Sequence, residues 1–396
     1  MLSFKFLLEA DRKDVDTANE QLSHLDHPYQ MHVLYGKRGA ESALSDLKAT
    51  HDYFKTGKSN KVYTSRKVDG GVSVILRNHP TFGFSASTKS AFNVNPKINY
   101  TEEDVDKNHG HAPGLAAALK HVLKHGKNLV APGHTIQGDL LYTHDKKKNT
   151  PGDPTVTEDG VSTTPNRIEL RHTGAPKKFG IALHTEYENN VAKSGVSPKA
   201  TIPSKDVFVA DTTFEPKANH YEKQHQDIAE KHLMKANEIV KSHPEHFDLS
   251  KEHKEHLLTY MNSLRSEAGP IVSPTHEGYK QHLTRIMEKK QSAVKTAMSK
   301  EQKASAFKAL MDEVDKNKPK FKSIFDFHDH VNKVTEALSS TLHHNKASNF
   351  STYIDGTPST DEGIVVADKK TRNIKFKLVP NHIASALKYN TRFSRA

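Results

Sequence analysis

The feature that most constrains the fold is a hydrophobic pattern that changes twice along the chain. Residues 61–214 contain short runs rich in β-branched residues, separated by Gly and Pro, which is typical of strands. In residues 215–345 Pro and Gly become rare and apolar residues recur at every third or fourth position, which predicts amphipathic helices. The strand pattern returns in residues 346–396. We therefore expect an α+β protein in which a large helical insertion interrupts a strand-rich domain.

Local patterns place individual elements within these segments. Residues 1–60 form an expected N-terminal helical segment, and Pro and Gly breaks near 243, 269, 273 and 318 divide the insertion into about five helices. The stretch 145–164, rich in Lys, Asp, Thr, Gly and Pro, predicts a long loop. The other expected elements are helices over 14–25, 40–54 and 115–123, and strands over 62–64, 72–76, 135–143, 167–172, 179–187, 363–367 and 374–379.

Composition excludes several classes of protein. The chain of 396 residues has no Cys, which excludes disulfide frameworks, thiolate catalysis and Cys-ligated zinc. No apolar run approaches the roughly 20 residues that cross a bilayer, and the first residues lack the pattern of a signal peptide, so we expect a cytoplasmic protein without a membrane partner. The formal charge of +11 favours a polyanionic partner such as nucleic acid, although a solubilising lysine surface explains it equally well.

Four short motifs, in order along the chain, carry the candidate chemistry. Lys67, Asp69 and Gly70 form a K-x-D-G motif after an expected strand. Asp139 follows a glycine within another expected strand, and Glu362 precedes a glycine and a buried strand. Lys375 and Lys377 are expected on one face of the last strand, because strand side chains alternate with period two. One such motif arises easily by chance, whereas the ordered set is far more specific.

With these motifs the chain resembles the covalent nucleotidyltransferase superfamily, which includes ATP-dependent RNA and DNA ligases and mRNA capping enzymes. Residues 179–185 stand where that superfamily has an aromatic–acidic strand. The resemblance covers about residues 61–190 and 350–380. It implies a ligase-type nucleotidyltransferase fold with ATP-grasp-like antiparallel sheets, split into 61–214 and 346–396. The 19 residues after Lys377 are too few for the OB fold that most ligases and capping enzymes have there, so we expect no C-terminal OB fold. Residues 27–39 and 89–93 also resemble an uncharacterised family of tailed bacteriophages, which implies the host cytoplasm.

The resemblance implies a role for each motif. Lys67 is expected to attack the α-phosphate of ATP, expel pyrophosphate and hold AMP as a phosphoramidate. A lysine amine has a pKa of about 10.4, so it must lose a proton first, and we expect burial and the fields of Lys375 and Lys377 to lower that pKa. The same two lysines are expected to stabilise charge on the α-phosphate. The resemblance therefore implies three catalytic lysines.

The remaining candidates are expected to bind the nucleotide and its metal ion. Asp139 and Glu362 supply hard oxygens for Mg²⁺ or contacts to the ribose. Arg66 and Lys89 are expected to contact phosphate, and Asp69 and Gly70 to shape the surroundings of the nucleophile. The base is expected near Phe179 and Leu183, where the chain lacks the exposed aromatic–acidic pair typical of the superfamily.

The function implied is that of an ATP-dependent polynucleotide ligase that seals 5′-phosphate to 3′-hydroxyl ends. RNA is favoured over DNA because compact RNA ligases lack the OB fold. Nucleotidyl transfer to another acceptor, as in capping, is one alternative. A non-catalytic nucleic-acid-binding phage protein on the same fold is another, and Ser65, Val72 and Leu183, which depart from the superfamily pattern, favour it.

Each motif also has a purely structural interpretation. Residues 70–71 suit a simple hairpin turn, and Asp139 and Glu362 suit solvated strand ends or turns. Lys375 and Lys377 suit the solvated face of an edge strand. The histidine pairs 253/256, 328/330 and 343/344 lack a matching third ligand, so no metal site is expected there.

Overall fold

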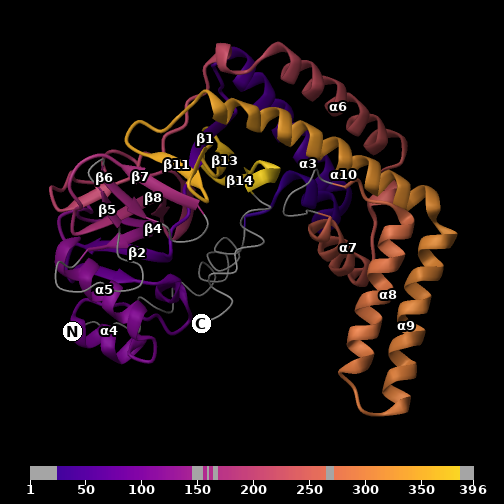
Figure 1. The fold of residues 1–396 in the computed structure, drawn as a ribbon, viewed down its shortest axis with the longest axis horizontal. Coiled ribbons are helices and arrows are strands. Elements are labelled where there is room, and N and C mark those ends of the chain that lie inside the picture. The colour runs from indigo at the N-terminus through magenta and orange to yellow at the C-terminus, as the bar shows by residue number, and fades with distance from the viewer. Residues whose placement is uncertain (1–24, 145–154, 158–159, 164–167, 265–271, 384–396) are drawn as a thin grey trace.

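In the computed structural model, the described residues are 25–144, 155–157, 160–163, 168–264 and 272–383. They form a mixed α+β structure with three sheets and several helices (Figure 1). Every strand pair in these sheets is antiparallel except β10 with β8. The expected α+β class with antiparallel sheets is therefore confirmed. Within the described part of the chain, no helix is long and apolar enough to cross a membrane.

A three-stranded sheet joins the beginning and the end of the described chain. Its order is β1 (Val62–Lys67), β13 (Gly363–Asp368) and β14 (Ile374–Leu378), each pair antiparallel. Lys67 stands opposite Gly363, and Lys377 stands opposite Val365. This register brings the K-x-D-G motif beside the Glu-Gly motif and the last lysine.

The largest sheet has six strands and one covered face. Its order is β10-β8-β4-β2-β3, with β9 paired to β8. Helices α4 (Glu102–His109) and α5 (Pro113–His125) share a buried core with side chains of this sheet that include Val74, Ile136 and Phe179. Because side chains alternate, Ser73 and Asp139 lie on the opposite face. The strands are β2 (Val72–His79), β3 (Gly83–Ser87), β4 (Thr135–Thr143), β8 (Phe179–Glu188), β9 (Val191–Ser194) and β10 (Val207–Val209).

The chain passes from one sheet to the other at residues 68–71. Strands β1 and β2 belong to different sheets, so the hairpin interpretation of Gly70 and Gly71 is wrong. The backbone runs tightly against β4, where the Gly71 N–H donates to the Leu140 carbonyl at 2.8 Å. A Cβ atom at Gly70 would lie 2.2 Å from that same carbonyl oxygen. Glycine at 70 therefore permits the close approach of the motif to β4.

We expect Gly70→Ala to lower the free energy of unfolding by about 1–3 kcal/mol, because the new methyl group meets backbone that cannot move aside. Gly114→Ala is the matched control, since nothing lies within 4 Å of a Cβ atom built there. Urea denaturation of both variants measures the difference. An unchanged midpoint for Gly70→Ala would show that the contact with β4 relaxes freely.

A third sheet of five strands contradicts one expectation. Two of its strands fall inside residues 145–164, where a long loop was predicted. The β-branched residues of 155–157 and 161–163 explain why the chain pairs there instead. The rest of that stretch lies outside the described residues. The sheet order is β12 (Thr357–Ser359), β11 (Ser351–Ile354), β7 (Ile168–His172), β6 (Gly160–Thr163) and β5 (Thr155–Thr157).

The N-terminal helix covers the three-stranded sheet. Helix α3 (Pro28–Thr56) contains the predicted helix over 40–54 and starts earlier, with Pro28 at its first turn. Gly36 breaks it with a φ of +63°. Leu47, Phe54 and Phe376 share one buried core with α6 (Lys223–Ser242) and α10 (Lys318–Ser339). The helix expected over 14–25 lies outside the described residues, apart from Leu25, which is not helical.

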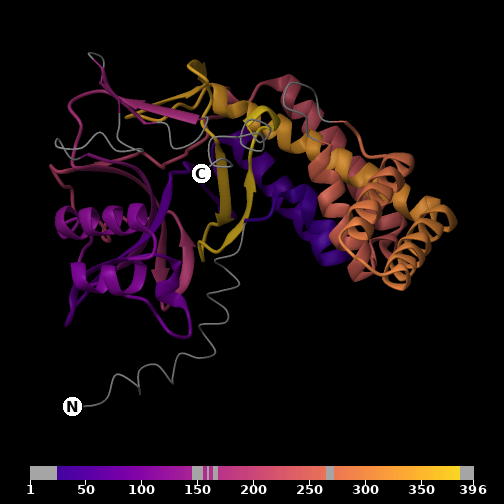
Figure 2. The same ribbon diagram turned by 60° about the horizontal axis from the view of Figure 1, so that its bottom comes forward.

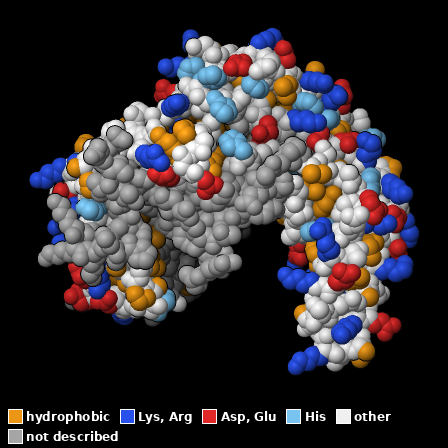
Figure 3. Space-filling model, in the orientation of Figure 1, with side chains coloured by type: hydrophobic (Ala, Val, Ile, Leu, Met, Phe, Trp, Pro, Cys, Tyr) orange, Lys and Arg blue, Asp and Glu red, His pale blue; other side chains and the backbone are white. Residues whose placement is uncertain are grey.

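The described part of residues 215–345 contains five α-helices, as predicted. The breaks at Pro244, Pro274 and Pro319 coincide with helix ends, whereas the break at 269–270 lies outside the described residues. Helices α8 and α9 lie side by side and project from the body as an arm (Figures 1 and 2). Acidic and basic side chains are interspersed along that arm (Figure 3). The remaining helices are η1 (Lys89–Phe92), η2 (Ala218–His220), η3 (Pro244–Phe247), α7 (Lys251–Ser263), α8 (His276–Ser292), α9 (Ala297–Lys316) and η4 (Ser340–His343).

Candidate functional site

Lys67 forms the centre of a buried charged cluster. It is the last residue of β1, and only 12% of its side chain is exposed. Its ammonium group makes ion pairs with Asp69, two residues later, and with Glu362, the residue before β13. A Glu362 oxygen also accepts a hydrogen bond from the Asp69 N–H at 3.1 Å. Two carboxylates from distant parts of the chain therefore share one ammonium group.

Asp139 brings the six-stranded sheet into the same cluster. One of its oxygens lies 3.5 Å from the Gly70 nitrogen, and the other lies 3.5 Å from Nε2 of His184. Burial alone would raise the pKa of Asp139, but hydrogen bonds from His184 and Ser73 hold it at about 2. Asp139 is thus a permanent carboxylate at neutral pH and suits a divalent cation or ribose hydroxyls.

The two lysines of β14 separate, contrary to expectation. Lys377 lies near Lys67: burial and the positive charge of Lys67 lower its pKa, against the opposing charges of Asp69 and Glu362. Lys375 instead pairs with Asp46 of α3 at 2.5 Å. The pairing of β14 with β13 shifts register at Lys375, because Val366 faces Phe376 and Ala367 faces Ile374. Because a bulge interrupts the alternation of side chains, Lys375 does not share the orientation of Lys377 that the sequence predicts.

The expected lowering of the Lys67 pKa is also wrong for this state of the protein. Burial does lower the pKa of Lys67, but the charges of Glu362 and Asp69 outweigh it and raise the pKa above its usual value. Burial and the nearby Asp69 raise the pKa of Glu362 to about 8, although Lys67 opposes the shift. The cluster therefore holds its protons, and Lys67 is a stored cation here rather than a free amine.

Arg66 and Lys89 lie outside the cluster. The Arg66 side chain is buried, pairs with Asp361 and donates to the Asn345 carbonyl at 2.8 Å. It is adjacent to Lys67 in β1 and so points to the other face. Lys89 is exposed at the start of η1. A phosphate contact by Arg66 at the Lys67 cluster is therefore excluded by its burial.

The expected base-binding residues face the wrong side of their strand. Phe179 and Leu183 are both buried in the core shared with α5. Neither ring nor methyl groups reach the face that carries Asp139, so a base cannot stack on them from the site. Alternation along β8 determines this, because Phe179, Ile181 and Leu183 all point toward that core.

Sequence reasoning missed His184, the residue that β8 contributes to the site. The β4–β8 pairing passes from Gln137–Thr185 directly to Gly138–Leu183, which leaves His184 as the extra residue of a bulge. The bulge turns the imidazole toward Asp139. On the same face, the Tyr187 hydroxyl donates to Gln137 at 2.5 Å, and its ring packs at a tilt of 34° against Phe92, with ring centroids 4.5 Å apart. The only sequence signal for this was a histidine where an acid is common.

The model of a family of unknown function, DUF6267, matches residues 19–390, so the chain belongs to that family. No curated protein and no solved structure matches the chain.

Proposed function

We propose that this protein is a nucleotidyltransferase that works through a covalent Lys67–nucleotide intermediate on a ligase-type fold. One observation carries the proposal: five charged residues from segments far apart in the sequence come together where the chain passes from the three-stranded sheet to the six-stranded sheet. These residues are Lys67, Asp69, Asp139, Glu362 and Lys377. The purely structural interpretations leave this convergence unexplained. They would place each motif at a solvated turn or edge, whereas Glu362 is only 4% exposed.

The proposed chemistry transfers AMP from ATP to Lys67. The Nζ lone pair forms a bond to the α-phosphorus, the bond to the bridging β-phosphate oxygen breaks, and pyrophosphate leaves with that electron pair. Nζ loses one proton to solvent before the attack and a second as the P–N bond forms, and it keeps one hydrogen as the nitrogen of a phosphoramidate. Lys377 is the cation placed to stabilise charge that develops on the α-phosphate, because it lies close enough to Lys67 for the charge of Lys67 to lower its pKa.

The carboxylates fit a magnesium ion bound together with the triphosphate. Mg²⁺ is usually held by one or two carboxylates plus substrate phosphates. Glu362, which pairs with Lys67, and Asp139, which lies against the Gly70 nitrogen, are the two that would hold it. When bound, the ion supplies positive charge against the triphosphate. Burial is the main cause of the raised pKa of Glu362, and the negative charge of Asp69 adds to it, so a cation bound beside these carboxylates would favour the ionised form of Glu362.

We further propose that the acceptor is a polynucleotide end, with RNA favoured over DNA. The net charge of +11 suits association with a phosphate backbone. Transfer to a different acceptor would use the same first step, so the acceptor is tested separately from the intermediate.

The first test detects the intermediate on the native protein. Purified protein is incubated with Mg²⁺ and ATP, GTP or NAD labelled at the phosphate that would be transferred, then denatured and separated on a gel. We expect one nucleotide per chain, released by acid but retained in alkali, as a phosphoramidate requires, and peptide mapping that places it on Lys67.

The exposed Lys61, just before β1, provides the matched control, because Lys61→Ala should label as the native protein does. Labelled protein is then mixed with nicked and single-stranded RNA and DNA to identify the acceptor. Folded protein that takes up no label from any of the three nucleotides would refute the enzymatic proposal and favour a nucleic-acid-binding role.

A further inference from the structure

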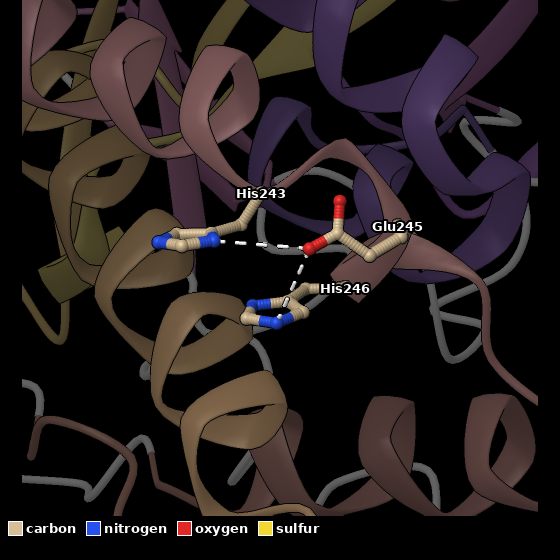
Figure 4. A group of neighbouring side chains, drawn as sticks. All are labelled: His243, Glu245 and His246. Carbon is tan, nitrogen blue, oxygen red and sulfur yellow. Dashed lines mark ion pairs between the residues drawn. The ribbon is translucent and has the colours of Figure 1, made fainter.

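The turn between α6 and α7 gathers three side chains of the kind that bind transition metals. His243, Glu245 and His246 form the only such group of three within the part of the chain that the structure describes. Their potential ligand atoms all lie within 4.8 Å of one another. Figure 4 shows both imidazole rings on one side of the Glu245 carboxylate, each with a nitrogen facing the same oxygen.

The separations suit a shared cation better than direct hydrogen bonds. Nδ1 of His243 lies 3.7 Å from the Glu245 oxygen, and Nε2 of His246 lies 3.5 Å from it. Both separations exceed a normal hydrogen bond. In a tetrahedral zinc site with bonds of about 2.0–2.2 Å, neighbouring ligand atoms stand roughly 3.3–3.6 Å apart. Both separations from the Glu245 oxygen are thus close to that value, and the ligand atoms of the two histidines lie within 4.8 Å of each other.

The backbone of the turn is fixed before any ion binds. Pro244 restricts φ at the first residue of η3. Phe247 is fully buried, with its ring centroid 5.2 Å from that of Phe327 in α10. Nδ1 of His246 contacts the Ser323 hydroxyl of α10 at 2.9 Å, which leaves Nε2 directed at Glu245. Such an outer contact orients metal-binding histidines in known sites.

One ring must turn for the ion to enter. The His243 and His246 rings are stacked with centroids 4.7 Å apart and an interplanar angle of 9°, so their lone pairs run side by side rather than converging. His243 is 52% exposed, and its side chain is free to rotate in solvent. His246 is held by Ser323 and needs no movement.

We propose that His243, Glu245 and His246 bind one Zn²⁺ ion, with water as the fourth ligand. Two imidazoles and one carboxylate form a ligand set that zinc accepts. The ion would fix the end of α6 to the turn before α7, and through Ser323 it would link that turn to α10. The site is independent of the proposed chemistry at Lys67 and stands whether or not that chemistry occurs.

The test uses the full chain, treated with a chelator, dialysed and titrated with Zn²⁺ in a calorimeter. We expect one tight equivalent that His246→Gln and Glu245→Gln each weaken at least 100-fold, and that Ser323→Ala weakens about tenfold. His111→Gln removes an exposed histidine elsewhere and should leave the tight equivalent unchanged. Circular dichroism verifies that each variant is folded.

A second measurement identifies the geometry. Co²⁺ bound in place of Zn²⁺ should give the intense visible absorption of a tetrahedral site in the native protein and in His111→Gln, and lose it in Glu245→Gln. The proposal is overturned if no tight equivalent exists, or if the native protein and the folded Glu245→Gln and His246→Gln variants bind equally well.

Discussion

Lys67→Ala should abolish the covalent nucleotide adduct, reducing its rate of formation below detection, because it removes the amine that pairs with both Asp69 and Glu362. Lys67→Arg should be equally inactive. A guanidinium group keeps the positive charge between Asp69 and Glu362 but does not lose its proton at any pH a protein tolerates. The arginine variant thus separates nucleophilicity from charge, and labelling with radioactive ATP measures both.

The pH dependence of adduct formation follows from the raised pKa of Lys67. Only the neutral amine attacks phosphorus, and Glu362 and Asp69 favour the charged form. We expect the initial rate to rise with pH from neutral to about pH 10, because the neutral fraction grows tenfold per unit below the pKa. Glu362→Gln removes the largest of the opposing charges, so its remaining activity should reach a plateau at lower pH. Identical profiles for the two proteins would contradict this assignment.

The raised pKa of Lys67 also bears on how the cluster behaves before a nucleotide binds. A lysine stored between two carboxylates has little reactivity until something competes for them. Glu362 and Asp139 would hold a magnesium ion, whose charge would compete with Lys67 for Glu362, and the nearby charge of Lys377 would oppose the return of a proton to Lys67. Nucleophile activation would then depend on nucleotide binding, which limits reaction of Lys67 in the free protein.

Local sequence patterns were sufficient for the elements that carry the cluster. Alternating or β-branched runs predicted β1, β4, β8, β13 and β14, and three-to-four periodicity predicted the helices of the insertion. The structure pairs Lys67 with Glu362, two of the expected site residues, although the sequence separates them widely. Such convergence is a property of topology, and it was available only through the resemblance to a known family.

The failed expectations share a physical cause, which is that the orientation of a strand side chain depends on its partners. Lys375 and His184 both stand at bulges, and a bulge changes direction without any clear signal in one sequence. Phe179 and Leu183 are buried because α5 covers their side of β8, which only the assembled sheet reveals. Arg66 is buried because Asp361, distant in sequence, supplies its counter-charge.

Arg66→Met should lower the free energy of unfolding by about 3–5 kcal/mol, because it leaves the Asp361 carboxylate buried without its partner. Asp361 would then keep one hydroxyl contact, from Thr352 at 3.0 Å. Urea denaturation measures the loss. Lys48→Met, which breaks an exposed pair with Asp52 on α3, is the control and should change stability by less than about 1 kcal/mol.

The penalty for Arg66→Met should also depend on pH in a defined direction. Burial already raises the pKa of Asp361 despite Arg66, and removing the arginine raises it further. A carboxyl group whose folded pKa exceeds its unfolded pKa favours the folded state at low pH and loses that advantage as pH rises through the folded value. The variant should therefore approach the native stability as the medium becomes acidic.

The double variant Arg66→Met/Asp361→Asn should recover part of the loss at neutral pH, since no buried charge remains. A penalty for Arg66→Met that is the same at every pH, with no recovery in the double variant, would mean that Arg66 stabilises the fold through packing against Phe214 rather than through Asp361.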